Sequence, residues 1–366
     1  MLRRAVRRRT AGLHGPVHLS LSGGHDSRGL LSLLAAESVD LRTFSYTQGP
    51  QAPLSDTRTA QALAARYGAR HQTVQAYRGD LLATVRRNAR WGHGVTNFCD
   101  EADAWDALAA SHLTHVFTGD EIHEIYPRRI SDVSEHLIRF HVLPFGSLGN
   151  LAGRLAPPFR RILEGAWAAE LDQMRAAATR HADPYQQNFM IMSGQYLPHY
   201  LLSWRERFAG RVAAMHTPYL DAALAEFNHR LPPPVLAGKR LFIDTLTRLD
   251  PQLYRVPLAR SSGYETDWRA ELIRHREAVK EDLLTGSSRL DGIIAPQAIR
   301  AVLDGLTAPG RGEPATLGAR VRRSLGTFRH SPAGQDVFGP VRSRVPSPAE
   351  PGHLAAPGVD PARAGH

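Results

Sequence analysis

The segment from Val17 to Leu34 places the strongest constraint on the fold of this chain. Apolar and polar residues alternate over Val17–Leu21, a Ser22-Gly23-Gly24 turn follows, and helical periodicity begins at Ser27. The alternation is typical of a strand, and the loop between a parallel strand and its helix is where an α/β sheet binds its ligand. The segment therefore predicts a strand–loop–helix unit of such a sheet.

The residues of this loop suit a phosphate site. Gly23 and Gly24 permit close backbone approach, and the N-terminus of the following helix presents free N–H groups and a positive dipole end to an anion. Ser22 and Ser27 add hydroxyl donors, and Asp26 supplies a carboxylate oxygen of the kind that Mg²⁺ binds. Nucleotide binding is the functional interpretation, and an ordinary strand-to-helix turn is the alternative.

Strands and helices continue to alternate as far as Gly119, which predicts an α/β fold with a parallel sheet and helices on both faces. An arginine-rich helix is expected over Leu2–Thr10. Further strands are expected at Leu41–Tyr46, His71–Val74 and Thr114–Thr118, and helices at Ser27–Ala36, Ser55–Tyr67, Gly79–Arg90 and Glu101–Ser111. Thr118-Gly119-Asp120, like the first loop, follows the carboxyl end of a strand, so both are expected to share one site.

The rest of the chain is expected to be mostly helical and then disordered. We divide residues 1–305 into an α/β part (17–150) and a helical part (151–305), followed by a tail (306–366) rich in Pro, Gly and Arg. The tail has too little apolar periodicity to offset the entropy of ordering it. The helices are expected at Arg160–Thr179, Pro184–Leu202, Ala222–Arg230, Lys239–Arg248, Asp267–Leu284 and Pro296–Leu303.

The formal net charge of +10 raises nucleic-acid binding as a function class. Arginine carries almost all of the positive charge, since Lys239 and Lys280 are the only lysines, and the arginines are scattered except near the start. Such a skew is more typical of a GC-rich genome than of phosphate contacts. Nucleic-acid binding therefore stays a minor alternative, predicted to be steeply salt-dependent.

Cysteine usage and hydropathy limit the cellular compartments in which this protein is expected. Cys99 is the only cysteine, so an internal disulfide and a thiolate metal cluster are excluded, and a reducing cytoplasm fits. No apolar run reaches the ~18–20 residues of a membrane span, and no apolar signal core follows the basic start. The prediction is a cytoplasmic protein without a membrane partner.

Leu21 to Ser27 resembles the SGGxDS pyrophosphate loop of the ATP pyrophosphatase (PP-loop) superfamily. The order of the later motifs is similar to the synthetase domain of asparagine synthetases, which are related to β-lactam synthetases and lasso-peptide cyclases. The resemblance spans Val17 to Tyr264 and implies an adenine nucleotide alpha hydrolase-like fold. It implies ATP and Mg²⁺ as cofactors, with Leu21, Ser22, Gly23, Gly24, Asp26 and Ser27 at the nucleotide and Asp26 on the metal.

A second stretch, Val116 to Tyr126, is similar to the TG[DE]GxDE signature of the same family. The resemblance implies nucleotide contacts from Thr118 and Gly119, a catalytic role for Asp120 and a metal-binding acid, which we assign to Glu124. This chain departs from the signature at His123, where the family has an aspartate. Mg²⁺ prefers oxygen to imidazole, so the departure weakens the expected metal site.

Three more elements follow the family order. The end of the second strand flanks adenine in the family, which makes Tyr46 a candidate neighbour of the base. Ser55 to His71 matches a further segment, for which the residues themselves favour a helix N-cap at Ser55-Asp56 and a structural role for His71. His216 to Asp221 resembles the R-x-P-F-L-D segment, with His216 in place of the arginine; a turn before an Asp-capped helix is the alternative.

The last element, Leu253 to Tyr264, contains a Gly-aromatic pair that follows a catalytic lysine in the family. Here Ser261 takes the place of that lysine, and Arg260 is the nearest cation and our candidate for the catalytic role. Arginine is larger than lysine and does not lose its proton, although it still neutralises phosphate charge.

The resemblance implies an ATP-dependent, AMP-forming amide ligase, in which a carboxylate is adenylated and an amine then attacks. The partners are a small-molecule or peptide carboxylate and an amine or ammonia. An N-terminal glutaminase domain is not expected in this chain, because residue 2 is leucine and the first strand begins by Val17. Three alternatives stay open: direct use of ammonia or another amine, supply by a separate amidotransferase, or a sequence that is part of a longer protein. The product, asparagine or a natural-product amide, stays open. A catalytically impaired nucleotide-binding scaffold is the alternative.

Overall fold

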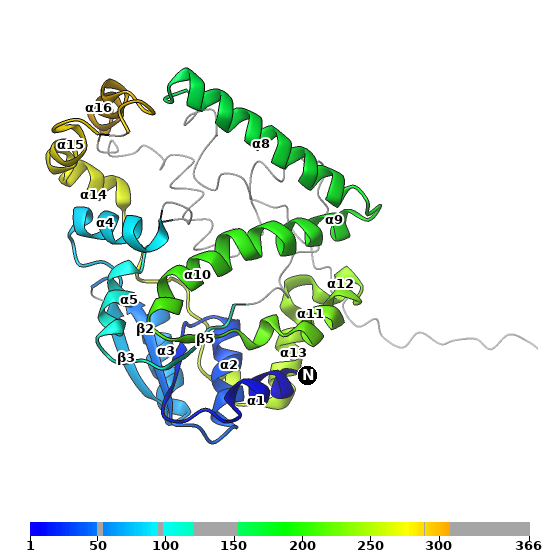
Figure 1. Ribbon diagram of the computed structural model, residues 1–366. Coiled ribbons are helices and arrows are strands. Elements are labelled where there is room, and N and C mark those ends of the chain that lie inside the picture. Colours follow the sequence, from blue (N-terminus) through cyan, green and yellow to red (C-terminus); the bar gives the residue numbers. More distant parts are fainter. Residues whose placement is uncertain (50–53, 94–97, 121–152, 289, 308–366) are drawn as a thin grey trace, which may run out of the picture.

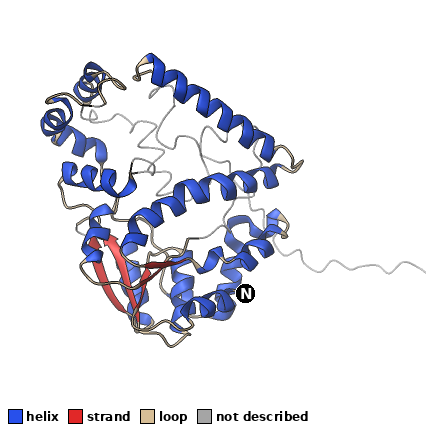
Figure 2. Cartoon of the chain, viewed as in Figure 1, coloured by secondary structure: helices blue, strands red, loops and turns tan. Residues whose placement is uncertain are grey.

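The computed structural model describes residues 1–49, 54–93, 98–120, 153–288 and 290–307. Strands lie together at one end of the molecule, and helices build the rest (Figures 1 and 2). The expected disorder of the tail concerns residues that lie almost entirely outside the described ranges and stays a prediction. In the described part, no helix is long and apolar enough to cross a lipid bilayer.

A five-stranded parallel sheet with the strand order β3-β2-β1-β4-β5 organises the fold. The parallel sheet predicted from the alternating strands and helices is therefore confirmed. The order runs outward in both directions from β1 and β4, so the topological switch point lies between these two strands. The strands are β1 (Val17–Ser20), β2 (Leu41–Thr47), β3 (Arg70–Gln75), β4 (His115–Phe117) and β5 (Ala214–His216).

Each face of the sheet carries its own apolar core. On one face, Val17, Leu19 and Phe117 pack with α1 (Leu2–Thr10), α2 (His25–Ala35) and α3 (Asp56–Arg66). On the other face, Phe44 and Val116 pack with α5 (Ala102–Ala109) and α10 (Ser203–Phe208), beside α4 (Leu81–Gly92). Neighbouring residues of a strand point to opposite faces, which explains why Val116 and Phe117 belong to different cores. The prediction of helices on both faces is confirmed.

The remaining elements are mostly helical, as predicted, with α8 and α14 to α16 far from α1 (Figure 1). They are α8 (Pro157–Ala178), α9 (Pro184–Ile191), the π-helix η2 (Met192–Leu202), η3 (Ala209–Arg211), η4 (Pro218–Leu220), α11 (Ala222–His229), α12 (Pro233–Leu236), η5 (Ala237–Lys239), α13 (Arg240–Leu249), η6 (Leu253–Arg255), α14 (Trp268–Arg274), α15 (Arg276–Leu284) and α16 (Pro296–Asp304).

Three local predictions in this part were wrong. Ala214–His216 forms the edge strand β5 beside β4, although no strand was expected there. The single helix expected over Pro184–Leu202 is α-helical only to Ile191 and continues as a π-helix containing Pro198, whose missing N–H cannot continue an α-helical ladder. The helix expected over Asp267–Leu284 is divided at His275 into α14 and α15.

Candidate active site

The predicted phosphate loop, residues 21–27, connects β1 to α2 and includes the first turn of α2. The start of this helix has no side-chain cap. Gly24 is the N-cap of α2 and offers no side chain to the first N–H groups of the helix. The loop is held from within, since the Ser22 backbone N–H donates to Ser27 Oγ at 3.0 Å and the two hydroxyl oxygens lie 2.9 Å apart. Leu21 is buried and donates its N–H to the Phe44 carbonyl of β2 at 2.8 Å. An uncapped helix start behind a fixed loop is suited to an anion.

Two glycines allow neighbouring segments to pack closely in this site. A Cβ on Gly23 would lie 2.3 Å from Ala259 Cβ and 2.9 Å from Thr59 Cβ. A Cβ on Gly119 would lie 2.7 Å from the backbone nitrogen of Ser27. The second motif thus packs directly on the first at the switch point between β1 and β4. The two motifs lie together, as a shared site requires, and their common role at a nucleotide stays a prediction.

Asp26 forms an ion pair with Lys239 that the sequence did not suggest. The Lys239 ammonium lies 2.6 Å from Asp26 Oδ1 and 2.8 Å from Oδ2, and the two side chains are 7% and 14% exposed. Lys239 has a left-handed backbone conformation at the start of α13, with φ 57°. The only available signal was that lysine is rare in this chain, where Lys239 and Lys280 are the two examples.

Asp120 is buried and engaged on both carboxylate oxygens. Arg205 of α10 donates from Nε to Oδ2 at 3.0 Å and from Nη2 to Oδ1 at 3.3 Å, and the Thr118 hydroxyl donates to Oδ2 at 2.7 Å. The carboxylate raises the pKa of Arg205, so this guanidinium stays charged in spite of its burial. Arg205 Nη1 is also buried and makes no hydrogen bond among the described residues. Sequence reasoning missed Arg205.

Glu101 and Tyr46 lie near this ion pair. Burial raises the pKa of Glu101 to about 7, although the charge of Arg205 opposes the shift. Burial also raises the pKa of the Tyr46 hydroxyl, so the phenol is neutral. The ring of Tyr46 packs edge-on against Trp105, 6.3 Å between centroids, and Tyr264, 5.3 Å. Tyr46 is only 8% exposed, and its role beside adenine stays a prediction.

The candidate cation Arg260 is exposed, and its backbone N–H donates to the Leu54 carbonyl at 2.7 Å. Its neighbour Ser261 pairs with Ser55 in an isolated parallel bridge. Lys239 contacts the loop through Asp26, and the catalytic role of Arg260 stays a prediction. Glu124 and His123 lie outside the described residues, so the metal assignment to Glu124 stays a prediction.

The residues of the other matched segments have structural contacts. Asp221 accepts from the Ala223 N–H as N-cap of α11 and forms ion pairs with Arg8 and Arg9 of α1. His216 stacks on Phe117, 4.6 Å between ring centroids. The Asp-capped helix that we weighed as the alternative is thus present, after the strand β5.

The residue-based interpretations of Ser55 and His71 are confirmed. The Ser55 hydroxyl accepts from the Arg58 N–H at the start of α3. The His71 ring contacts the hydroxyl groups of Thr43 at 2.7 Å and Ser45 at 3.1 Å. Burial lowers the pKa of His71 to about 4, which keeps the ring neutral at physiological pH.

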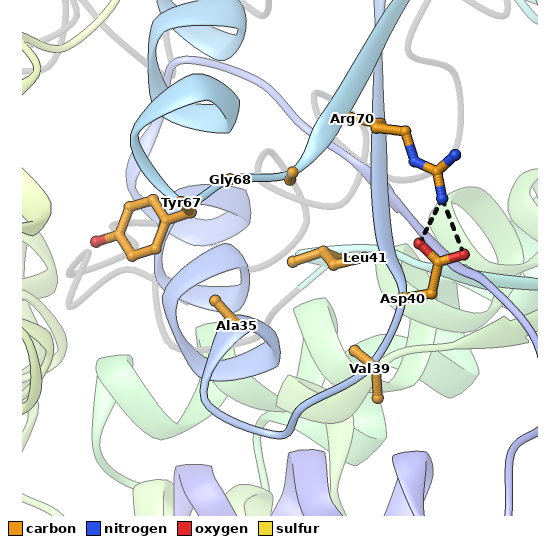
Figure 3. A pocket seen from close by; sticks show the side chains of 8 residues that line it. Ala35, Val39, Asp40, Leu41, Tyr67, Gly68 and Arg70 are labelled. Atoms are coloured by element: carbon orange, nitrogen blue, oxygen red, sulfur yellow. Dashed lines mark hydrogen bonds and ion pairs between the residues drawn. The ribbon is translucent and has the colours of Figure 1, made fainter.

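A cavity of about 210 Å³ lies at the opposite end of the sheet (Figure 3). Asp40 and Arg70 form an ion pair at its edge, with a shortest distance of 3.0 Å, close to where β2 and β3 begin. Ligands of parallel α/β sheets bind at the carboxyl ends of the strands, so we do not assign the nucleotide to this cavity. Its lining residues are Ala35, Val39, Asp40, Leu41, Tyr67, Gly68, Ala69 and Arg70.

The parallel sheet and the loops at its switch point define an adenine nucleotide alpha hydrolase-like fold with a PP-loop. The family model of asparagine synthase matches residues 1–320. The chain therefore belongs to the asparagine synthase family, a family of ATP-utilising PP-loop ligases, and the resemblance noted in the sequence is confirmed.

Other comparisons are distant. No curated protein matches the sequence. Among solved structures, the chain is similar to the U34-tRNA thiolase NcsA from Methanococcus maripaludis, solved with its 4Fe-4S cluster. The identity is 12%, the TM-score is 0.29, and the match covers 89% of this chain and 87% of the thiolase. A TM-score this low supports no argument about function.

Proposed function

We propose that the protein is an ATP-dependent, AMP-forming amide ligase. The observation that carries this proposal is the junction of the two motifs at the switch point, where Gly119 packs on Ser27 and Lys239 lies on Asp26. Ligands of such sheets bind at this point, and the uncapped start of α2 suits a polyphosphate.

The chemistry proceeds in two steps. A carboxylate oxygen of the substrate attacks the α-phosphorus of ATP, and the bond to the β-phosphate breaks with release of pyrophosphate. An amine nitrogen then attacks the acyl carbon of the adenylate, AMP leaves, and the amine gives up a proton. A small-molecule or peptide carboxylate and an amine or ammonia are the substrates, and a separate amidotransferase is a candidate source of the ammonia.

In this proposal the phosphate loop and Lys239 bind the pyrophosphate part of ATP. Ser22, Gly24 and Ser27 offer hydroxyl and N–H donors, and Gly23, whose N–H donates to Asp56 Oδ1 at 3.0 Å, permits close backbone approach. A lysine ammonium that is nearly buried neutralises phosphate charge more effectively than an exposed one, because solvent screens it less. Thr118 and Gly119 lie against the loop. Arg260 stays a candidate for stabilising the negative charge of the transition state at the rim of the site.

The residues present fit a magnesium ion that arrives with the nucleotide. Among the described residues, no group of three or more His, Cys, Asp and Glu that would hold a metal occurs. Mg²⁺ is commonly held by one or two carboxylates together with substrate phosphates, and Asp26 meets that requirement if Lys239 turns toward a phosphate. The ion would neutralise charge on the phosphates.

A catalytically impaired nucleotide-binding scaffold is the second candidate. The observation in its favour is that both acids of the site, Asp26 and Asp120, are engaged by cations. Such a protein binds ATP but releases no pyrophosphate with any carboxylate.

Calorimetry with a non-hydrolysable ATP analogue tests the site, with and without Mg²⁺, for the wild type, Asp26→Ala and the remote variant Asp172→Ala. We expect Mg²⁺-dependent binding that Asp26→Ala weakens at least about tenfold and Asp172→Ala leaves unchanged. Binding equal in all three proteins would refute the assignment of Asp26. Pyrophosphate release across a panel of carboxylates then separates the ligase from the scaffold.

A further inference from the structure

Arg28, one residue beyond the phosphate loop, is a completely buried arginine. Its side chain is 0% exposed, and the described residues supply no ion pair to it. Burial lowers the pKa of the guanidinium, but an arginine does not lose its proton at physiological pH. A positive charge is thus fixed directly behind the loop.

In the described part of the chain, all hydrogen bonds of this guanidinium go to backbone carbonyls, and the Tyr254 ring lies 5.5 Å from its carbon. Nη2 donates to Gly23 at 3.1 Å and Nε to Gly24 at 3.3 Å, both within the loop. The other bonds join the segment before Arg260: Nη1 donates to Leu253 at 3.1 Å and to Val256, and Nη2 donates to Pro257 at 2.9 Å. Five carbonyls match the five N–H donors of a guanidinium, which lysine does not offer.

These bonds fix the direction of the N–H groups in the loop. A trans peptide is planar, so its N–H points away from its C=O. Because Arg28 draws the carbonyls of Gly23 and Gly24 toward the interior, the N–H groups of Gly24 and His25 point to the opposite side. Among the described residues, the Gly24 N–H reaches only Ser22 Oγ, at the long distance of 3.4 Å. Both groups are therefore directed toward the place of an anion.

The positive charge of Arg28 also favours an anion on the loop. The positive dipole end of α2 and the buried guanidinium lie close together, and among the described residues no carboxylate forms an ion pair with Arg28; Asp56 accepts the Gly23 N–H at 3.0 Å. An anion on the loop is attracted by both positive groups, and the low local dielectric makes the attraction larger than at an exposed arginine.

We propose that Arg28 is the positioning residue of the pyrophosphate site: it orients the Gly24 and His25 amides and attaches the loop to residues 253–257. This inference deepens the proposed function and rests on it. Arg28 does not touch the ligand itself, so its replacement changes affinity by misdirecting the amides and by altering the charge behind them.

Binding of inorganic pyrophosphate to the full-length protein, measured by calorimetry, tests the proposal. Arg28→Lys keeps the charge but not the five bonds, and Arg28→Gln loses both; Arg248→Lys on the exposed side of α13 is the matched control. Hydrogen bonds to charged groups are strong enough that we expect a loss of about tenfold for Arg28→Lys and about 100-fold for Arg28→Gln. The control should stay within about twofold of the wild type.

The outcomes separate the two proposals. A wild type that does not bind pyrophosphate refutes the nucleotide site itself. A wild type that binds, beside an Arg28→Lys variant of equal affinity, overturns the role of Arg28 alone. If the variants do not fold, amide hydrogen exchange of the wild type decides: pyrophosphate should slow exchange at Gly24 and His25, and unchanged exchange there overturns the proposal.

Discussion

Replacing Gly119 by alanine is expected to separate the two halves of the site. The added Cβ would lie 2.7 Å from the Ser27 nitrogen and 3.0 Å from the Asp26 carbonyl carbon, both of them backbone atoms. No side-chain rotation relieves such contacts. An ordinary contact of 3.4 Å needs a relative shift of about 0.7 Å between the end of β4 and the phosphate loop.

Two effects of this shift are measurable. Overpacking of this kind lowers the free energy of unfolding by about 1–3 kcal/mol. A misplacement near 1 Å in a binding site costs up to about 100-fold in function, so we expect affinity for an ATP analogue to fall by about 10- to 100-fold. Urea unfolding and calorimetry measure the two quantities.

Gly165 in the middle of α8 provides the control. No atom lies within 4 Å of a Cβ added there, and the residue is exposed. Because glycine in a helix interior is less favourable than alanine, Gly165→Ala should gain about 0.5–1 kcal/mol and bind the analogue normally. A Gly119→Ala protein with wild-type stability and affinity would refute the reasoning that the loop and β4 are in contact.

Four further perturbations follow from the buried titratable groups. Arg205→Met leaves the Asp120 carboxylate buried without a counter-ion and should cost about 3–5 kcal/mol in urea unfolding, of which Asp120→Asn in the same chain restores most; a double variant no more stable than the single one would contradict the pairing. Lys239→Met should weaken binding of the ATP analogue at least about tenfold, and unchanged affinity would exclude the ammonium from the site. Because the pKa of His71 is lowered to about 4, its contribution to stability is fully present above about pH 6.5 and is lost as the pH falls toward 4, so His71→Gln should lose less stability than the wild type between those values. The stability contribution of Glu101 depends on pH in the opposite direction, because its pKa is raised to about 7: the contribution is present below about pH 4.5 and is lost as the pH rises through 7. Glu101→Gln should therefore be more stable than the wild type at pH 8. A variant no more stable than the wild type at that pH would contradict burial as the cause of the raised pKa.

The sequence by itself determined the α/β fold and the location of the phosphate loop, because both depend on local patterns. Alternation over Val17–Leu21 gives β1, the Ser22-Gly23-Gly24 turn follows, and helical periodicity gives α2. The N-cap at Ser55 was likewise readable, since a side chain caps the helix that it precedes.

Only the tertiary structure decided which charges meet. Lys239 reaches Asp26 across more than 200 residues of sequence. Arg205 reaches Asp120 from α10, which packs on the face of the sheet opposite to α1, α2 and α3. The strand β5 has only three residues and pairs with a distant strand, so its own sequence carried no signal. Periodicity reports how a segment contacts its immediate surroundings, whereas an ion pair depends on how distant segments pack. The loop of this site was therefore predictable from sequence, and its cations were not.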